Sequence, residues 1–186
     1  LLDLIKPTTG EVLNNGINVR TSENWKSFTS AFLDESFLIS YLMPEEYFYF
    51  VGELRSFSKK QVDEFLKQFE DLFNGEILGG KKFIRDLSKG NQKKVGIVAA
   101  LIGDPEVIIL DEPFANLDPT TQIRLKKIIK TLSQKVGVTV LVSSHDLQDV
   151  TEVSDRIVLL EKGLVIKDIK KTKKTLQDLE TYFNKE

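Results

Sequence analysis

The chain has 186 residues, which suits one domain, or one domain with a subdomain, and is enough to bury a sizeable core. A formal net charge of −2 argues against nucleic-acid binding through bulk charge. The chain has no cysteine, which excludes a disulfide framework and a thiolate metal site, and no apolar run approaches the ~18 residues needed to cross a membrane.

The first part of the chain predicts the end of a helix and then a β-hairpin. Residues 1–6, LLDLIK, are typical of the last turn or two of a helix, which Pro7 and Gly10 would interrupt. Residues 11–19 predict two short strands, because NNG at residues 14–16 is a turn signal.

Helix signals and aromatic side chains follow. Pro44 and the two glutamates after it start a helix in the favoured way, and Ser58 can cap a second one. The second helix has apolar residues at helical spacing, namely Val62, Phe65, Leu66, Phe69, Leu72 and Phe73. Most of the phenylalanines of the chain lie between Phe28 and Phe83. We expect most of these in the core and some on a surface that faces a partner.

Residues 75–81, GEILGGK, match the phosphate-loop pattern G-x-x-x-x-G-K. Lys82 stands where that pattern needs a serine or threonine to hold magnesium, and an amphipathic helix precedes the match instead of a buried strand. We therefore interpret the match as coincidental and expect a loop.

Residues 107–110, VIIL, form an uninterrupted apolar run, which predicts a strand buried on both faces, as in a parallel sheet. Asp111 and Glu112 follow at once, and then Pro113, which cannot continue the ladder. Two carboxylates are therefore expected at the carboxyl end of a central strand, where open α/β sheets bind ligands. Taken alone, the two acids would simply end a strand.

A helix is expected over residues 91–102, just before this strand, with Ser88 and Gly90 at its start. The N-terminus of a helix offers free N–H groups and a positive dipole end, which suit a phosphate. Lys89 would add a positive charge there. Ser88 alone would be an ordinary N-cap.

The rest of the chain predicts a helix, a strand, a hairpin and a closing helix. The first helix covers about residues 120–135, and much of its apolar face comes from Ile123, Ile128, Ile129 and Leu132. Residues 138–142 predict another buried strand, residues 156–160 and 164–169 a hairpin, and residues 175–183 a peripheral helix.

His145, the only histidine, follows the strand at residues 138–142 and precedes Asp146, a helix-cap residue. A lone histidine is more often structural than catalytic. Its position at the carboxyl end of a strand favours a functional role here.

Four short motifs resemble those of ABC-type ATPases, in the order and at the spacing of that family. They are LSKGN at residues 87–91 (the LSGGQ signature), VIILDEP at 107–113 (the Walker B strand), FANLD at 114–118 (the D-loop) and SSHDL at 143–147 (the switch-histidine segment). Each motif is weak alone, but together they are specific. The resemblance covers essentially the whole chain.

The resemblance implies an α/β fold, a P-loop NTPase core of the ABC ATPase type with a mostly parallel sheet and an inserted α-helical subdomain. Residues 1–186 would form a single partial ABC ATPase domain. Its helical subdomain would cover residues 36–86, and the signature helix and catalytic core residues 87–170. LIKPTTGEV at residues 4–12 resembles the segment after the first helix of the family, so the Walker A loop is expected upstream of Leu1.

The resemblance also implies ATP and Mg²⁺ as ligands. Asp111 would hold Mg²⁺, Glu112 would polarise the attacking water, and His145 would contact the γ-phosphate. Glu35 stands where the family has the glutamine of its Q-loop and would sense the same phosphate, since a glutamate can accept from water or approach a metal ion. The alternative for Glu35 is an ordinary acid at the end of a strand.

A head-to-tail dimer of ATPase domains is implied as well. Ser88, Lys89, Gly90 and Asn91 would bind the nucleotide held by the other subunit, and Asp118 would link the two sites. Lys89 and Asn91 replace a glycine and a glutamine of LSGGQ, which we interpret as an adjustment because the change adds a positive charge and keeps an amide.

Three functions compete. The leading one is the ATP-hydrolysing subunit of a membrane ABC transporter, with export as one option, working as a homo- or heterodimer with transmembrane subunits at the cytoplasmic face of the cell membrane. The second is a soluble ABC-type ATPase that acts on ribosomes or DNA, although the sequence shows neither a second cassette nor a long coiled coil. The third is a non-catalytic interaction module. The intact Asp111, Glu112 and His145 argue against it for the parent protein, and for the 186 residues alone it stays an alternative. The sequence does not reveal the cargo.

Overall fold

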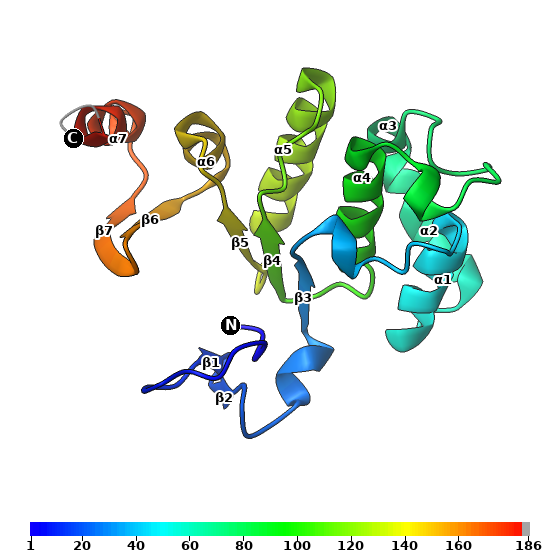
Figure 1. The fold of residues 1–186 in the computed structure, drawn as a ribbon, viewed down its shortest axis with the longest axis horizontal. Coiled ribbons are helices and arrows are strands. Elements are labelled where there is room, and N and C mark those ends of the chain that lie inside the picture. Colours follow the sequence, from blue (N-terminus) through cyan, green and yellow to red (C-terminus); the bar gives the residue numbers. More distant parts are fainter. Residues whose placement is uncertain (184–186) are drawn as a thin grey trace.

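The structure, a computed structural model, describes residues 1–183. In chain order the elements are β1 (Leu13–Asn14), β2 (Ile17–Asn18), η1 (Asn24–Ser27), β3 (Thr29–Phe32), η2 (Glu35–Phe37), α1 (Pro44–Leu54), α2 (Lys59–Leu66), η3 (Lys67–Phe69), α3 (Glu70–Phe73), η4 (Ile84–Asp86), α4 (Lys89–Ala100), β4 (Val107–Asp111), α5 (Pro119–Ser133), β5 (Thr139–Ser143), α6 (Leu147–Val153), β6 (Arg156–Glu161), β7 (Leu164–Lys170) and α7 (Thr175–Phe183). The strands β3, β4 and β5 lie in the middle, with α1 to α4 gathered on one side and β6, β7 and α7 on the other (Figure 1).

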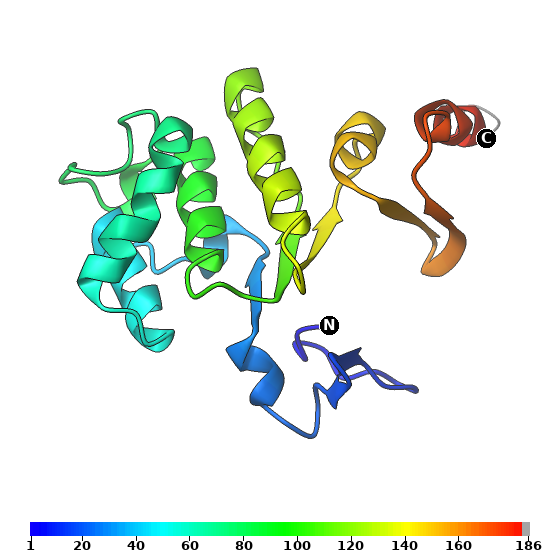
Figure 2. The ribbon, with the colours of Figure 1, turned by 180° about the vertical axis from the view of Figure 1, so that it is seen from behind.

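The central sheet is parallel and has the strand order β3–β4–β5. Ala31 lies opposite Ile109 in one pair of strands, and Ile109 lies opposite Leu141 in the other. Parallel neighbours need a crossover, which runs through α1 to α4 before β4 and through α5 before β5 (Figure 2). The predicted parallel sheet is confirmed, and its three strands end at one common edge.

The strands β4 and β5 differ in burial. Ile108, Ile109 and Leu110 on β4 are buried on both faces of the sheet, as predicted. The prediction that β5 is also buried was wrong, because its residues alternate between exposed and half-buried and Leu141 is 46% exposed. Since successive side chains point to opposite faces, only one face of β5 packs against the described core.

The helices after β3 begin where the sequence predicts. Pro44 is the first residue of α1, and the Glu46 carboxylate accepts from the backbone N–H of Met43 at 2.8 Å. Ser58 caps α2 by accepting from the N–H of Gln61, whose side-chain oxygen accepts in return from the N–H of Ser58 at 2.9 Å. These reciprocal bonds satisfy donors that a helix start leaves free.

One apolar core joins the helices to the sheet. It includes Phe48 of α1, Val62 of α2, Leu72 of α3, Val98 of α4 and Ile108 of β4. The helices within residues 36–86 therefore share their core with α4 and the sheet.

Gly96 lets α4 approach β3 closely. A Cβ at this position would lie 2.3 Å from Cε2 of Phe32, a residue that is itself buried. Only glycine fits between the helix and this ring without displacing one of them.

The apolar face of α5 differs in part from the prediction. Thr121, Leu125 and Ile129 are buried and lie four residues apart on one face of the helix. Ile123, which was predicted on that face, is 68% exposed. It follows Thr121 by two residues, which is a rotation of about 200° around the helix, so it lies on the opposite side.

The N-terminal prediction was right for the hairpin and wrong for the helix. Strands β1 and β2 pair antiparallel around Asn15 and Gly16. Residues 1–6 contain no helix and form a bend at residues 3–5, and Asp3 has a φ of 54°, which a right-handed helix does not allow. A segment this short gains too few hydrogen bonds to form a helix without packing.

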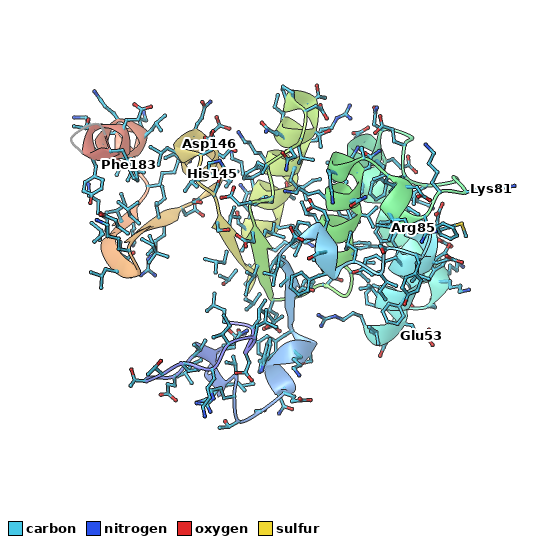
Figure 3. All side chains as sticks on the ribbon, viewed as in Figure 1. Glu53, Lys81, Arg85, His145, Asp146 and Phe183 are labelled. Carbon is cyan, nitrogen blue, oxygen red and sulfur yellow. The ribbon has the colours of Figure 1, made fainter. Side chains whose placement is uncertain are left out.

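The segment 75–81 is a loop after α3, as predicted. Gly79 has a φ of 76°, and its N–H donates to the carboxylate of Glu45 on α1. Lys81 lies on the opposite side of the molecule from His145 (Figure 3). The tip of this loop therefore lies away from His145, while Glu76 near its start pairs with Lys94 of α4.

The last third of the described chain agrees with the predicted hairpin and helix. Strands β6 and β7 pair antiparallel through Lys162 and Gly163, and α7 follows. Among residues 1–183, no helix is both long and apolar enough to cross a bilayer.

Candidate active site

Polar side chains follow each of the three central strands at the carboxyl edge of the sheet. Asp111 ends β4 and Glu112 follows it, and His145 comes two residues after the end of β5. Glu35 comes three residues after β3 and begins η2. Parallel strands bring these segments to one edge, so the structure places the predicted catalytic and metal-holding residues together.

Glu112 and His145 form a hydrogen-bonded pair. The Glu112 Oε1 atom lies 2.8 Å from Nδ1 of His145 and also accepts from the backbone N–H of His145 at 3.0 Å. His145 is exposed at the start of the loop that leads into α6, next to Asp146, which caps that helix (Figure 3). The pair fixes the carboxylate and leaves Oε2 of Glu112 open to a ligand.

Glu112 raises the pKa of His145. The hydrogen bond is the largest cause and the carboxylate charge the next, while loss of solvent contact acts in the opposite direction. Because folding raises this pKa, the pair stabilises the folded chain at low pH, and that contribution is lost as the pH rises through the raised value.

Replacing Glu112 by glutamine is expected to lower the pKa of His145 toward its ordinary value of 6.5, because glutamine removes the negative charge and leaves only a weaker, neutral hydrogen-bond acceptor. The measurement is an NMR titration of the His145 ring signal, assigned by its absence in His145→Gln. The matched control is Glu106→Gln. Glu106 is an exposed acid just before β4, at the end of the strand opposite to Glu112, and its replacement should leave the pKa of His145 unchanged. An unchanged pKa in Glu112→Gln would show that the pair does not form in solution.

Asp111 is held from the neighbouring strand. Ser143, opposite Asp111 in the sheet register, donates its hydroxyl hydrogen to the Asp111 carboxylate. The same hydroxyl oxygen accepts from the N–H of Glu112 at 3.2 Å. Ser143 therefore links both acids, while Asp111 stays exposed at the edge of the sheet.

Glu35 lies beside a buried lysine. Its Oε1 atom is 3.7 Å from Nζ of Lys93 on α4, and the side chain of Glu35 is only 12% exposed. This oxygen is buried and accepts no hydrogen bond from the described residues. Burial and a charge partner distinguish Glu35 from an ordinary acid at the end of a strand.

The predicted signature residues begin α4. Ser88 is the N-cap and accepts from the N–H of Asn91 at 3.2 Å, and both Ser88 and Lys89 are exposed. A Cβ on Gly90 would lie 3.3 Å from the carbonyl oxygen of Asn116, so this turn packs on the segment between β4 and α5. A hydrogen bond from the side chain of Asn91 is the largest cause of the lowered pKa of Glu76.

Asp118 is the N-cap of α5. Its carboxylate accepts from the N–H of Thr121 at 3.0 Å and from the Thr121 hydroxyl, and these bonds are the main cause of its lowered pKa. The described structure thus assigns Asp118 a local role at the start of a helix.

Sequence reasoning missed Ser143 and Lys93 as neighbours of the site. Ser143 had a usable signal, because it ends a strand two residues before the predicted catalytic histidine. Lys93 had none, since a lysine in a helix normally faces solvent.

The described part of the chain has the fold of an ATP-binding cassette. A solved ATP-binding subunit of an ABC transporter is 25% identical, with a TM-score of 0.81, and the match covers 98% of this chain and 74% of that one. A dimeric ATP-binding cassette in a post-hydrolysis state, bound to ADP and Pi, has the same fold, with a TM-score of 0.74 at 24% identity over 90% of this chain and 75% of that one.

The chain belongs to the ABC transporter family, which it matches over residues 1–115. The energy-coupling factor transporter ATP-binding protein EcfA2 of Staphylococcus epidermidis is 31% identical over 88% of this chain and 59% of its own length. The methionine import ATP-binding protein MetN of Lactococcus lactis is 30% identical over 88% of this chain and 50% of its own length. The chain thus spans between 50% and 59% of the length of these relatives.

Proposed function

We propose that the protein is the ATP-binding and hydrolysing subunit of a membrane transporter. The observation that carries this proposal is the placement of Glu112, directly after Asp111 at the end of β4 and 2.8 Å from the ring of His145. The relatives, whose names are those of transporter ATP-binding proteins, support a role in transport.

In the proposed reaction, Glu112 orients the attacking water and takes its proton. Its Oε1 is fixed by His145, which leaves Oε2 for the water. A positioned acid–base group of this kind contributes about 10²–10⁴-fold to the rate. The raised pKa of His145 favours the charged ring, whose Nε2–H can donate to the γ-phosphate.

The acids fit a magnesium ion bound together with its nucleotide. Among the described residues there is no group of three or more histidine, cysteine or acidic side chains that could hold a metal ion alone. This suits Mg²⁺, which is commonly bound through one or two carboxylates, waters and the phosphates of the substrate. Asp111 would hold the ion and Glu35 would lie near it, and Mg²⁺ would supply neutralising charge to the phosphates.

We place a second ATPase domain against the start of α4. Ser88 and Lys89 are exposed there, and free N–H groups at a helix start favour a phosphate. In this arrangement residues 88–91 would face the nucleotide of the other subunit, and Asp118 would lie close to the shared interface.

Transmembrane subunits would dock beside α1, on the cytoplasmic face of the cell membrane. A groove of about 340 Å³ lies there, lined in part by Phe37, Val51 and Leu54. Phe37 and Leu54 are exposed, as are Tyr41 and Phe50 nearby, and exposed aromatic side chains are typical of interfaces. The residues 36–86 would then form the lobe that receives the membrane subunits.

The 186 residues alone are expected to bind ATP weakly and to hydrolyse it negligibly, because they contain no G-x-x-x-x-G-K-[ST] loop to cradle the phosphates. The relatives are longer than the region that the chain matches, and we propose that a longer, full-length protein carries such a loop and hydrolyses Mg-ATP. Calorimetry and phosphate release on both polypeptides test this. Micromolar binding with magnesium-dependent turnover by the 186 residues would give the loop at 75–81 a role. A full-length protein without turnover would reject the proposed function.

A further inference from the structure

Lys93 is a buried cation directly beneath the acids of the site. It lies on α4 and is only 5% exposed. Lysine is almost never buried to this degree unless it is paired, because its charge loses the solvation of water. The contacts of its ammonium group therefore indicate what keeps it there.

The ammonium group of Lys93 reaches two segments at the edge of the sheet. Its Nζ donates to the backbone carbonyl of Glu112 at 2.8 Å. It also lies 3.7 Å from Oε1 of Glu35. One side chain thus contacts the acid that follows β4 and the acid that follows β3.

The backbone of Glu112 needs such support. Its φ of 44° lies in the left-handed region, which residues with a Cβ adopt at a cost. Besides Lys93, its carbonyl accepts from the N–H of Ala115 at 3.3 Å, and its own N–H donates to Ser143. A strained residue that is held from several sides keeps its carboxylate in one place.

Glu35 is held by charge and keeps an unused acceptor. Its Oε1 is buried and has no hydrogen-bond donor among the described residues. The nearby positive charge of Lys93 compensates the buried carboxylate without occupying the oxygen. Because this oxygen is shielded from solvent, a ligand at the edge of the sheet would meet the part of the Glu35 side chain that is exposed, which is 12% of it.

We infer that Lys93 is a positioning residue, which fixes the backbone of Glu112 and the carboxylate of Glu35 together so that both acids meet the same bound nucleotide. The inference rests on the proposed function. Lys93 itself makes no contact with ATP in this arrangement, and it acts through Glu112 and Glu35.

The test compares Lys93→Met with Lys94→Met in the full-length protein. The two lysines are neighbours on α4 and are equally buried, at 5% exposure, but Lys94 pairs with Glu76 instead of with Glu35 or Glu112. Lys93→Met is expected to lower kcat for ATP about 10- to 100-fold and to leave KM within about 3-fold, because chemistry and not binding depends on the placement of Glu112. Lys94→Met should leave both within about 3-fold.

The pairing with Glu35 is tested by a double-mutant cycle. If part of the effect passes through Glu35, Lys93→Met should cost less in a Glu35→Gln background than in the wild type. The double variant also removes the uncompensated buried charge that could unfold Lys93→Met alone. If Lys93→Met lowers kcat by the same factor in both backgrounds, Lys93 acts through Glu112 alone and the part of the inference that concerns Glu35 is rejected.

A second readout does not need turnover. At fixed pH, the NMR signal of the His145 ring reports the position of Glu112, so it should shift in Lys93→Met and stay in place in Lys94→Met. A signal that stays in place in Lys93→Met, or equal changes in the two variants, would overturn the inference. If the wild type does not hydrolyse ATP but the His145 signal shifts in Lys93→Met as expected, the proposed function is rejected and the positioning role of Lys93 stands.

Discussion

Replacing Glu112 by glutamine is expected to lower ATP turnover of the full-length protein by roughly 10²-fold or more, the range of a positioned acid–base group. Glutamine keeps the shape and part of the hydrogen bonding but cannot take a proton from water. Binding of Mg-ATP should survive, because Asp111 and its bond from Ser143 are unchanged. ATP joins the two subunits in the proposed arrangement, so the variant should also accumulate as a dimer.

Turnover and light scattering, with and without Mg-ATP, measure both effects. Glu106→Gln makes the same chemical change at the opposite end of β4 and should behave as the wild type. Near-normal turnover in Glu112→Gln would remove this residue from the mechanism. Lost turnover without an ATP-dependent dimer would keep the catalytic role and reject the head-to-tail arrangement.

Replacing Gly96 by leucine is expected to cost roughly 3 kcal/mol of folding free energy or more, the upper part of the range for overpacked cores. The Cβ alone would lie 2.3 Å from the ring of Phe32 and 3.2 Å from Leu38, and both residues are buried. The gain in helix propensity, about 1 kcal/mol, is too small to offset this clash. Chemical denaturation followed by circular dichroism gives the change.

A compensating pair tests the cause. Gly96→Ala should destabilise less than the leucine variant, and Phe32→Leu should cost about 1 kcal/mol or more through lost burial. Because the smaller side chain makes room for the new methyl group, the double variant should be more stable than the sum of the two changes predicts. Strict additivity would show that contact with Phe32 is not what excludes a side chain at Gly96.

The parts of the site that depend on local pattern were predictable. An apolar run followed by two acids placed Asp111 and Glu112 at the end of β4, and a second run placed His145 after β5. Ser58 and Pro44 likewise marked helix starts through chemistry that acts within one turn. Such signals involve neighbours in the sequence, so they do not need the fold.

What the sequence did not reveal depends on contacts between distant segments. Whether the second face of β5 is covered is decided by which elements pack on it, and the run of apolar residues there looked the same as in β4. Lys93 looks like a solvated helix residue until α4 packs under the sheet and brings its ammonium to Glu112, 19 residues away. The left-handed backbone of Glu112, which explains the need for that contact, has no mark in the sequence either.

The open side of β5 has a consequence for handling the 186-residue polypeptide. In the described sheet β5 pairs only with β4, so its other edge presents unpaired N–H and C=O groups beside the exposed Leu141. Leu160, Leu164 and Val165 of the nearby hairpin are exposed as well. Such an edge is a template for adding strands from other molecules. Self-association that increases with protein concentration and does not depend on nucleotide would therefore indicate non-specific pairing of sheet edges. It would not be evidence for a dimer of ATPase subunits.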